Sequence, residues 1–285
     1  MDSGAPEVGA APEGVRWLAT GEGQAPPLLS FHTWSGEVDH DRALAAALGD
    51  RSVISLLRPD AAVRPVPTEV SGWVAHYLAV LDELPVEPPY WLLGWSFGGV
   101  VALEVGRALS ERGVEVAYVG MIDAVKPLRF SEQLQLFARK VRSIDGWQAR
   151  LRHVDERRRI FVAQLRAGMK ENRGEVARHL GLRSKRAPTT TSATKDVFAA
   201  AVHASYLAYR PRAADLPVAV FACDRSIEVF GGPSLGWDRY LPAGVVCRRL
   251  EGTHRTLFDE EHVASTATAI AESLAASELR GASSD

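Results

Sequence analysis

Two hydrophobic patterns alternate along most of the chain. Short continuous apolar runs predict buried strands, and longer segments with apolar residues three or four positions apart predict helices. The expected strands cover residues 15–18, 27–31, 52–57, 90–93, 114–122, 217–222 and 245–250. The expected helices cover residues 41–48, 70–81, 100–112, 194–209 and 262–279. Strands that are separated by helices predict an α/β fold, with a mostly parallel sheet and helices on both faces.

One long segment interrupts this alternation. Residues 126–186 contain helical patterns but no convincing strand, and they carry 17 Lys and Arg against 6 Asp and Glu. A helical insertion between two sheet strands is typical of a lid, which we expect at about residues 127–210. Its charge suits either an ordinary solvated helix face or a docking face for an acidic partner or a phosphate-bearing arm. RNA binding is disfavoured, because the segment lacks interleaved aromatic residues and any nucleic-acid module.

Composition limits the function classes further. The 285 residues have a net charge of −2 and 46% hydrophobic content, which indicates neither nucleic acid nor membrane as a partner. There is no run of 18 apolar residues. Residues 1–14 are typical of a flexible linker or tail, so we expect one domain over 15–285. Cys223 and Cys247 make neither a zinc site nor a disulfide framework, and they favour a reducing, cytoplasmic location.

The motif that carries chemistry is Gly94-Trp95-Ser96-Phe97-Gly98. It follows a predicted strand and precedes a predicted helix, which is the context of a nucleophile elbow. In so sharp a turn, side chains at positions 94 and 98 would clash, and the serine takes a strained backbone conformation that exposes its hydroxyl. Ser96 is therefore the candidate nucleophile.

A serine hydroxyl needs a base and an orienting carboxylate. Of the eight histidines, His254 follows the strand that ends near residue 250, in a loop on the same side of the sheet as the elbow. Asp123 and Asp224 each end a predicted strand, so either side chain can lie at the edge of the sheet that also carries the elbow and His254. Pattern alone does not decide which aspartate orients His254. The arrangement common in α/β hydrolases places the acid after the later strand, which favours Asp224.

The motif Gly94–Gly99, the strand that ends in Met121-Ile122-Asp123, and Gly252-Thr253-His254 together resemble the α/β-hydrolase-fold thioesterase domains that end non-ribosomal peptide and polyketide synthases. The resemblance runs from about residue 27 to the C-terminus. In that family the acid follows the first strand after the elbow helix, which implies Asp123, with Asp224 as the alternative.

The resemblance also implies the remaining parts of the site. The loop Phe31–Gly36 would supply one oxyanion-hole N–H, from Trp34 or alternatively from Thr33, and Phe97 would supply the second. The enzyme would release an acyl, peptidyl or polyketide chain from a carrier protein's phosphopantetheine thioester, through acyl-Ser96, by hydrolysis or macrocyclisation. No cofactor of its own is implied. Because carrier proteins tend to be acidic, the positive charge of the lid leads us to expect the carrier to dock there, at Arg157, Arg158 and Arg159.

Three other functions remain open at this point. A discrete editing thioesterase and a hydrolase of small esters or amides would use the same three residues. A catalytically inactive binding module is the third, and the complete Ser, Asp and His set in the expected order argues against it.

Overall fold

The computed structural model describes residues 14–18, 25–49, 51–60, 65–127 and 192–282. A seven-stranded sheet with the order β1-β3-β2-β4-β5-β6-β7 organises them. All neighbouring strands run parallel except the edge strand β1, which is antiparallel to β3. The strands are β1 Val15–Leu18, β2 Leu28–Phe31, β3 Val53–Leu56, β4 Tyr90–Trp95, β5 Val116–Ile122, β6 Val218–Cys223 and β7 Val245–Leu250. Each predicted strand is present, within about two residues of its expected bounds.

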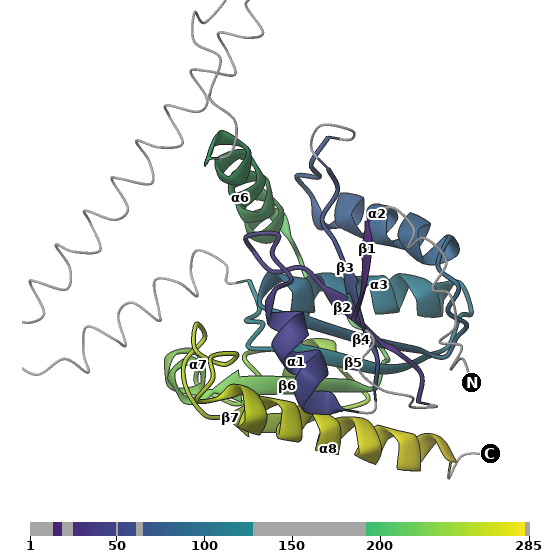
Figure 1. Ribbon diagram of the computed structural model, residues 1–285, viewed down its shortest axis with the longest axis vertical. Helices are drawn as coiled ribbons and strands as arrows, with labels where there is room; N and C mark the ends of the chain where they lie inside the picture. The colour runs from purple at the N-terminus through teal and green to yellow at the C-terminus, as the bar shows by residue number, and fades with distance from the viewer. Residues whose placement is uncertain (1–13, 19–24, 50, 61–64, 128–191, 283–285) are drawn as a thin grey trace, which may run out of the picture. The chain divides into compact units, whose positions relative to one another are not determined.

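Helices cover both faces of this sheet (Figure 1). The helices are α1 His40–Leu48, α2 Val70–Asp82, α3 Phe97–Glu111, α6 Ser192–Ala208, α7 Asp224–Phe230 and α8 Val263–Ala282, with a short 3₁₀ helix η1 Asp238–Tyr240. The helices α1 and α8 contact each other on one face, and α2 and α3 contact each other on the other. The predicted α/β architecture is confirmed.

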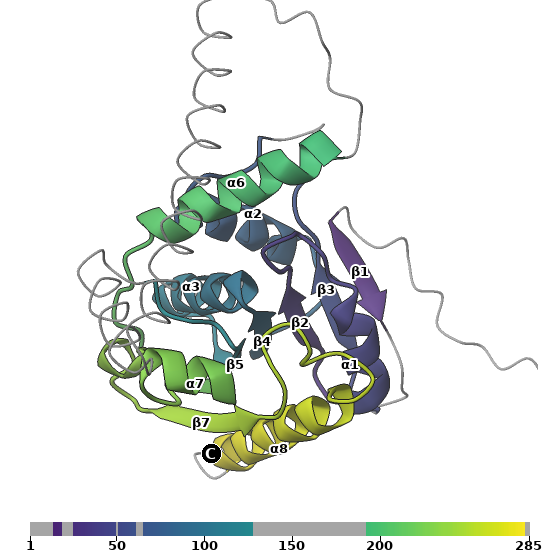
Figure 2. The same cartoon turned by 90° about the vertical axis from the view of Figure 1, so that its left-hand side faces the viewer.

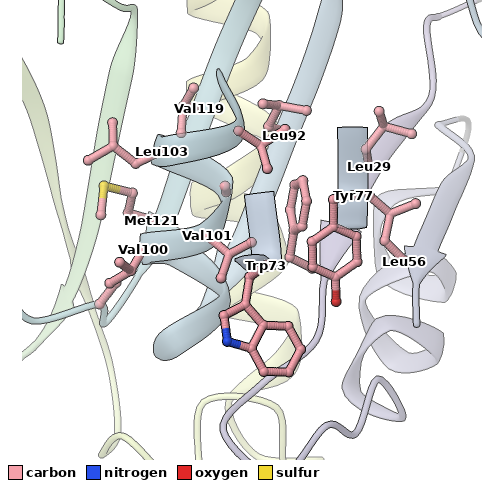
Figure 3. Packing of buried hydrophobic residues seen from close by; sticks show 14 of the residues in the cluster. Leu29, Leu56, Trp73, Tyr77, Leu92, Val100, Val101, Leu103, Val119 and Met121 are labelled. Carbon is pink, nitrogen blue, oxygen red and sulfur yellow. The ribbon is translucent and has the colours of Figure 1, made fainter. Parts of the chain in front are cut away.

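Two hydrophobic clusters lie on the two faces of the sheet. The larger one joins β2, β4 and β5 to α2 and α3, and Figure 3 shows its central side chains, including Trp73, Tyr77 and Val101. The second joins the opposite faces of the same strands to α1 and α8. Because both faces are covered, the central strands are apolar at successive positions, as the continuous runs predicted.

The helix α6 lies beside α2 (Figure 2), and polar contacts hold it there. Trp73 Nε1 donates to Ser205 Oγ at 3.0 Å. The Tyr209 hydroxyl, just after the helix, donates to Glu104 Oε1 on α3 at 2.6 Å. Most of the expected lid, residues 128–191, lies outside the described residues, so the lid and the domain boundaries stay predictions.

The helix α7 was not predicted. It begins at Asp224, directly after β6, whereas the sequence pattern predicted this aspartate to be the end of the strand.

Candidate active site

Ser96 lies at the turn between β4 and α3. Its backbone angles are φ 58° and ψ −119°, a conformation that non-glycine residues rarely adopt. Its N–H donates to the carbonyl of Ile122 at 2.8 Å, so the turn rests on the carboxyl end of β5. The expected elbow is therefore present, with the serine in a strained conformation at the carboxyl edge of the sheet.

Two glycines make this turn sterically possible, for different reasons. A Cβ on Gly94 would lie 2.1 Å from the carbonyl carbon of Gly98, as the sequence analysis expected. A Cβ on Gly98 would instead lie 2.6 Å from the carbonyl oxygens of Phe31 and His32. The absence of a side chain at Gly98 thus allows the end of β2 to approach the turn, and does not serve to avoid a clash with position 94.

Asp123 and His254 meet beside this turn. Asp123 directly follows β5, and its Oδ2 lies 2.7 Å from His254 Nδ1. The carboxylate is buried, whereas the imidazole is 44% exposed. Because an ionised carboxylate only accepts hydrogen bonds, the proton of a neutral imidazole lies on Nδ1 and leaves Nε2 as an acceptor. The Trp95 ring, next to Ser96 in the chain, lies 5.6 Å from the His254 ring.

Cys223 and Ser226 supply three further hydrogen-bond donors to the Asp123 carboxylate. The Cys223 N–H donates to Oδ1 at 3.1 Å, and Ser226 Oγ and Cys223 Sγ lie 2.9 Å and 3.3 Å from Oδ2. Burial alone would raise the pKa of Asp123, but the hydrogen bonds from His254, Ser226 and the Cys223 N–H outweigh it and lower the pKa below its usual value. Asp123 is therefore ionised at neutral pH despite its burial.

Asp224 does not reach His254. As the first residue of α7 it forms an ion pair with Arg249 of β7, and both side chains are more than half exposed. Of the two acids that the sequence left open, the structure brings Asp123 to the histidine and turns Asp224 toward solvent.

The two candidate N–H groups in the loop after β2 differ in their hydrogen bonds. The Thr33 N–H donates to the Glu37 carbonyl at 3.2 Å, so it is already engaged. Within the described residues, the Trp34 N–H has no hydrogen-bond acceptor. Phe97 is the first residue of α3, so its N–H has no acceptor inside that helix. Both N–H groups that were expected to form the hole are thus available.

His32 anchors this loop from inside the protein. It is fully buried, its Nδ1 donates to the Thr33 carbonyl at 2.6 Å, and its ring lies against those of Trp73 and Phe97. Desolvation by burial lowers its pKa to about 4, so the ring is neutral under physiological conditions.

Four residues near the sheet edge were not assigned a role from the sequence: Cys223 and Ser226 beside Asp123, and another aspartate–histidine pair, Asp41 and His40. The Asp41 carboxylate accepts from Ser30 on β2 and Ser55 on β3, both at 2.7 Å, and pairs with His40 at 3.1 Å. No local pattern marks Cys223 or Ser226, because they lie 100 and 103 positions from Asp123 in the chain. Asp41 and His40 are neighbours in the chain, but the hydroxyl donors to Asp41 come from two separate strands.

Comparison with known proteins agrees with this geometry. The thioesterase domain family matches residues 26–274. The chain belongs to the thioesterase domain family.

Three individual proteins show how far the similarity extends. The NocB thioesterase domain of the nocardicin cluster is 25% identical, with a TM-score of 0.62 over 92% of this chain and 98% of that one. Enterobactin synthase component F of Escherichia coli K12 is 32% identical over 109 residues, which are 37% of this chain and 8% of that protein. Orsellinic acid synthase ArmB of Armillaria ostoyae is 34% identical over 102 residues, 36% of this chain and 4% of that one. The matched segments thus cover under a tenth of the length of these synthases.

The remaining predictions concern partners and bound groups. Arg157, Arg158 and Arg159 lie outside the described residues. In the described part of the chain, no group of three His, Cys, Asp or Glu side chains is placed to hold a metal ion. Nor does any described helix have the length and apolar content to cross a membrane.

Proposed function

We propose that this thioesterase domain releases an acyl or peptidyl chain from the phosphopantetheine thioester of a carrier protein, through an ester on Ser96. The observation that carries the proposal is the 2.7 Å hydrogen bond between Asp123 and His254, residues 131 positions apart, at the edge where the strained Ser96 also lies. Synthases among the relatives support the carrier-bound substrate, since such enzymes build their products on carriers.

In the first step, Ser96 Oγ attacks the thioester carbon while His254 Nε2 takes its proton. Asp123 keeps the imidazole in the Nδ1–H tautomer and stabilises the imidazolium that forms. The Trp34 and Phe97 N–H groups donate to the oxyanion, and a single donor of this kind contributes roughly 10²–10³ in rate. The C–S bond then breaks, and the proton passes from His254 to the leaving thiolate.

In the second step, a nucleophile resolves the acyl ester. Water gives a carboxylic acid, and a hydroxyl or amine of the chain itself gives a lactone or lactam. His254 takes the proton of the nucleophile and returns it to Ser96 Oγ as the C–O bond of the ester breaks. The same three residues serve both outcomes, and exclusion of water decides between them.

Intact-protein mass spectrometry tests the proposal. The probes are a fluorophosphonate and a short acyl thioester of N-acetylcysteamine, and the first is suggested by a NocB thioesterase domain structure that is a covalent complex with a fluorophosphonate nocardicin G analog. We expect one added acyl or phosphonyl group on the wild type and none on Ser96→Ala. An unlabelled wild type, under conditions that label a control serine hydrolase, would make the domain a binding module instead.

Carrier dependence tests the substrate. We expect a much higher kcat/KM for an acyl group on a phosphopantetheinylated carrier protein than for the same acyl group on N-acetylcysteamine. Charge reversal at Arg157, Arg158 and Arg159 should raise KM for the carrier-bound substrate and leave the short thioester unaffected. Equal kcat/KM for both substrates would favour a hydrolase of free small esters, and equal effects of the charge reversal would refute docking at these arginines.

A further inference from the structure

Two residues at the junction of β6 and α7, Cys223 and Ser226, contact the Asp123 carboxylate, which follows the neighbouring strand β5. Ser226 Oγ lies 2.9 Å from Oδ2, the oxygen that also accepts from His254 at 2.7 Å. The Cys223 N–H lies 3.1 Å from Oδ1. Each carboxylate oxygen therefore has its own protein donor, so the plane of the carboxylate is held at both ends.

The fold brings these donors to Asp123 through the pairing of β5 with β6. The Asp123 N–H donates to the Phe221 carbonyl of β6 at 2.6 Å, which sets the ends of the two strands side by side. Cys223 is the last residue of β6, and Ser226 lies in the first turn of α7. Both residues are buried, at 0% and 8% exposure.

Asp123 needs such support for two reasons. Its φ of 44° is a conformation that non-glycine residues seldom adopt, so the backbone alone does not hold it well. Its carboxylate is also buried, and a buried charge must be met by donors. Without them, His254 alone would meet the negative charge and fix the plane of the carboxylate.

We propose that Ser226 is a positioning residue for Asp123, with Cys223 in a supporting role. Ser226 sets the orientation of the carboxylate and takes part of the negative charge that would otherwise act on His254 alone. The inference rests on the proposed function, because the effect on catalysis passes through Asp123 and His254.

The pH dependence of kcat/KM for a short acyl thioester tests this role. In Ser226→Ala the carboxylate loses one donor and binds the imidazolium more tightly, so we expect the acidic limb to move up by ~0.3–1 pH unit. The plateau should fall by ~3–10-fold, because the carboxylate is less well oriented. Ser226→Cys, which keeps a weak donor of similar size, should give an intermediate shift. Cys223→Ala should have a smaller effect, because its backbone N–H remains.

Ser234→Ala is the matched control. Ser234 is also buried and donates to a carboxylate, Asp238 Oδ2, at 2.6 Å, but it makes no contact with Asp123. We expect the wild-type pH profile for this variant. If Ser234→Ala shifts the profile as Ser226→Ala does, the shift reflects general destabilisation and the inference is wrong.

A spectroscopic measurement separates this inference from the proposed function. The low-field ¹H NMR resonance of the His254 Nδ1 proton reports the hydrogen bond to Asp123 and needs no turnover. We expect Ser226→Ala to move this resonance and Ser234→Ala to leave it in place. An active wild type with an unchanged profile and resonance in Ser226→Ala would overturn the positioning role alone. A wild type that is neither acylated nor labelled would overturn the proposed function, while the resonance would still test the contact.

Discussion

Asp123→Asn removes one charge and changes one acceptor into a donor, and the contacts of Asp123 determine how the amide must sit. The Cys223 N–H, at 3.1 Å from Oδ1, requires an oxygen at that position. The amide NH₂ therefore takes the position of Oδ2, facing His254 Nδ1 and the Ser226 hydroxyl. The hydroxyl can rotate and accept, but the imidazole has no such freedom.

His254 can accept from the amide only if its proton moves from Nδ1 to Nε2. An Nε2 that carries a proton cannot take one from Ser96, so the variant holds the wrong tautomer for the first step. We expect kcat to fall by ~10³–10⁴-fold, since the equivalent change in serine proteases lowers it by about 10⁴. That loss corresponds to about 4–5.5 kcal/mol of transition-state stabilisation. KM for a short thioester should change little, because Asp123 lies behind the histidine.

Asp224→Asn removes the same charge from the neighbouring strand end and is the control. Asp224 is exposed and paired with Arg249, so its loss should leave kcat unchanged. The assay is steady-state hydrolysis of an acyl N-acetylcysteamine thioester by both variants, with thermal unfolding to confirm that both are folded. A fast Asp123→Asn together with a slow Asp224→Asn would refute the assignment and return the acid to the later strand.

Three other changes test separate parts of the structure. Gly98→Ala places a Cβ 2.6 Å from two backbone carbonyl oxygens, so chemical denaturation should show a loss of ~1–3 kcal/mol, whereas Gly232→Ala, with no atom within 4 Å, should be close to neutral. His32 has a pKa of about 4 in the fold against 6.5 unfolded, so the unfolded state binds more protons as pH falls between these values. The wild type should then lose about 2 kcal/mol between neutral pH and about pH 5 that His32→Asn does not lose; parallel pH profiles of the two would contradict this burial. Tyr209→Phe leaves the buried Glu104 without one donor, so its free energy of unfolding should fall by ~1–3 kcal/mol, and an unchanged denaturation midpoint would argue against the anchoring of α6.

The strands were predictable because their signal is local. A strand that is covered on both faces must be apolar at successive positions, and turn residues bound each run. The helix α7 escaped prediction because its seven residues span about two turns, too few for a helical period to emerge. It also follows β6 without an intervening glycine or proline, so no turn residue in the sequence separates the strand from the helix.

The same distinction separates the parts of the site. Ser96 was predictable because the elbow is defined by glycines within two residues of it. The choice between Asp123 and Asp224 depends on a contact with His254, 131 positions from Asp123, and no local pattern encodes that contact. Even Gly98, correctly singled out, has its steric partner in the carbonyls of Phe31 and His32 rather than in the motif itself.

The two strand ends are therefore not equivalent places for an acid in this fold. Cys223 and Ser226 occupy the space beside Asp123 and donate hydrogen bonds to it. A second carboxylate at this buried position would lie within hydrogen-bond distance of Asp123, and the two like charges would repel each other. The early start of α7 avoids this conflict, because it turns Asp224 outward to Arg249 and turns Ser226 inward. The position at which β6 ends thus places Cys223 and Ser226 beside Asp123, and Asp224 beside Arg249.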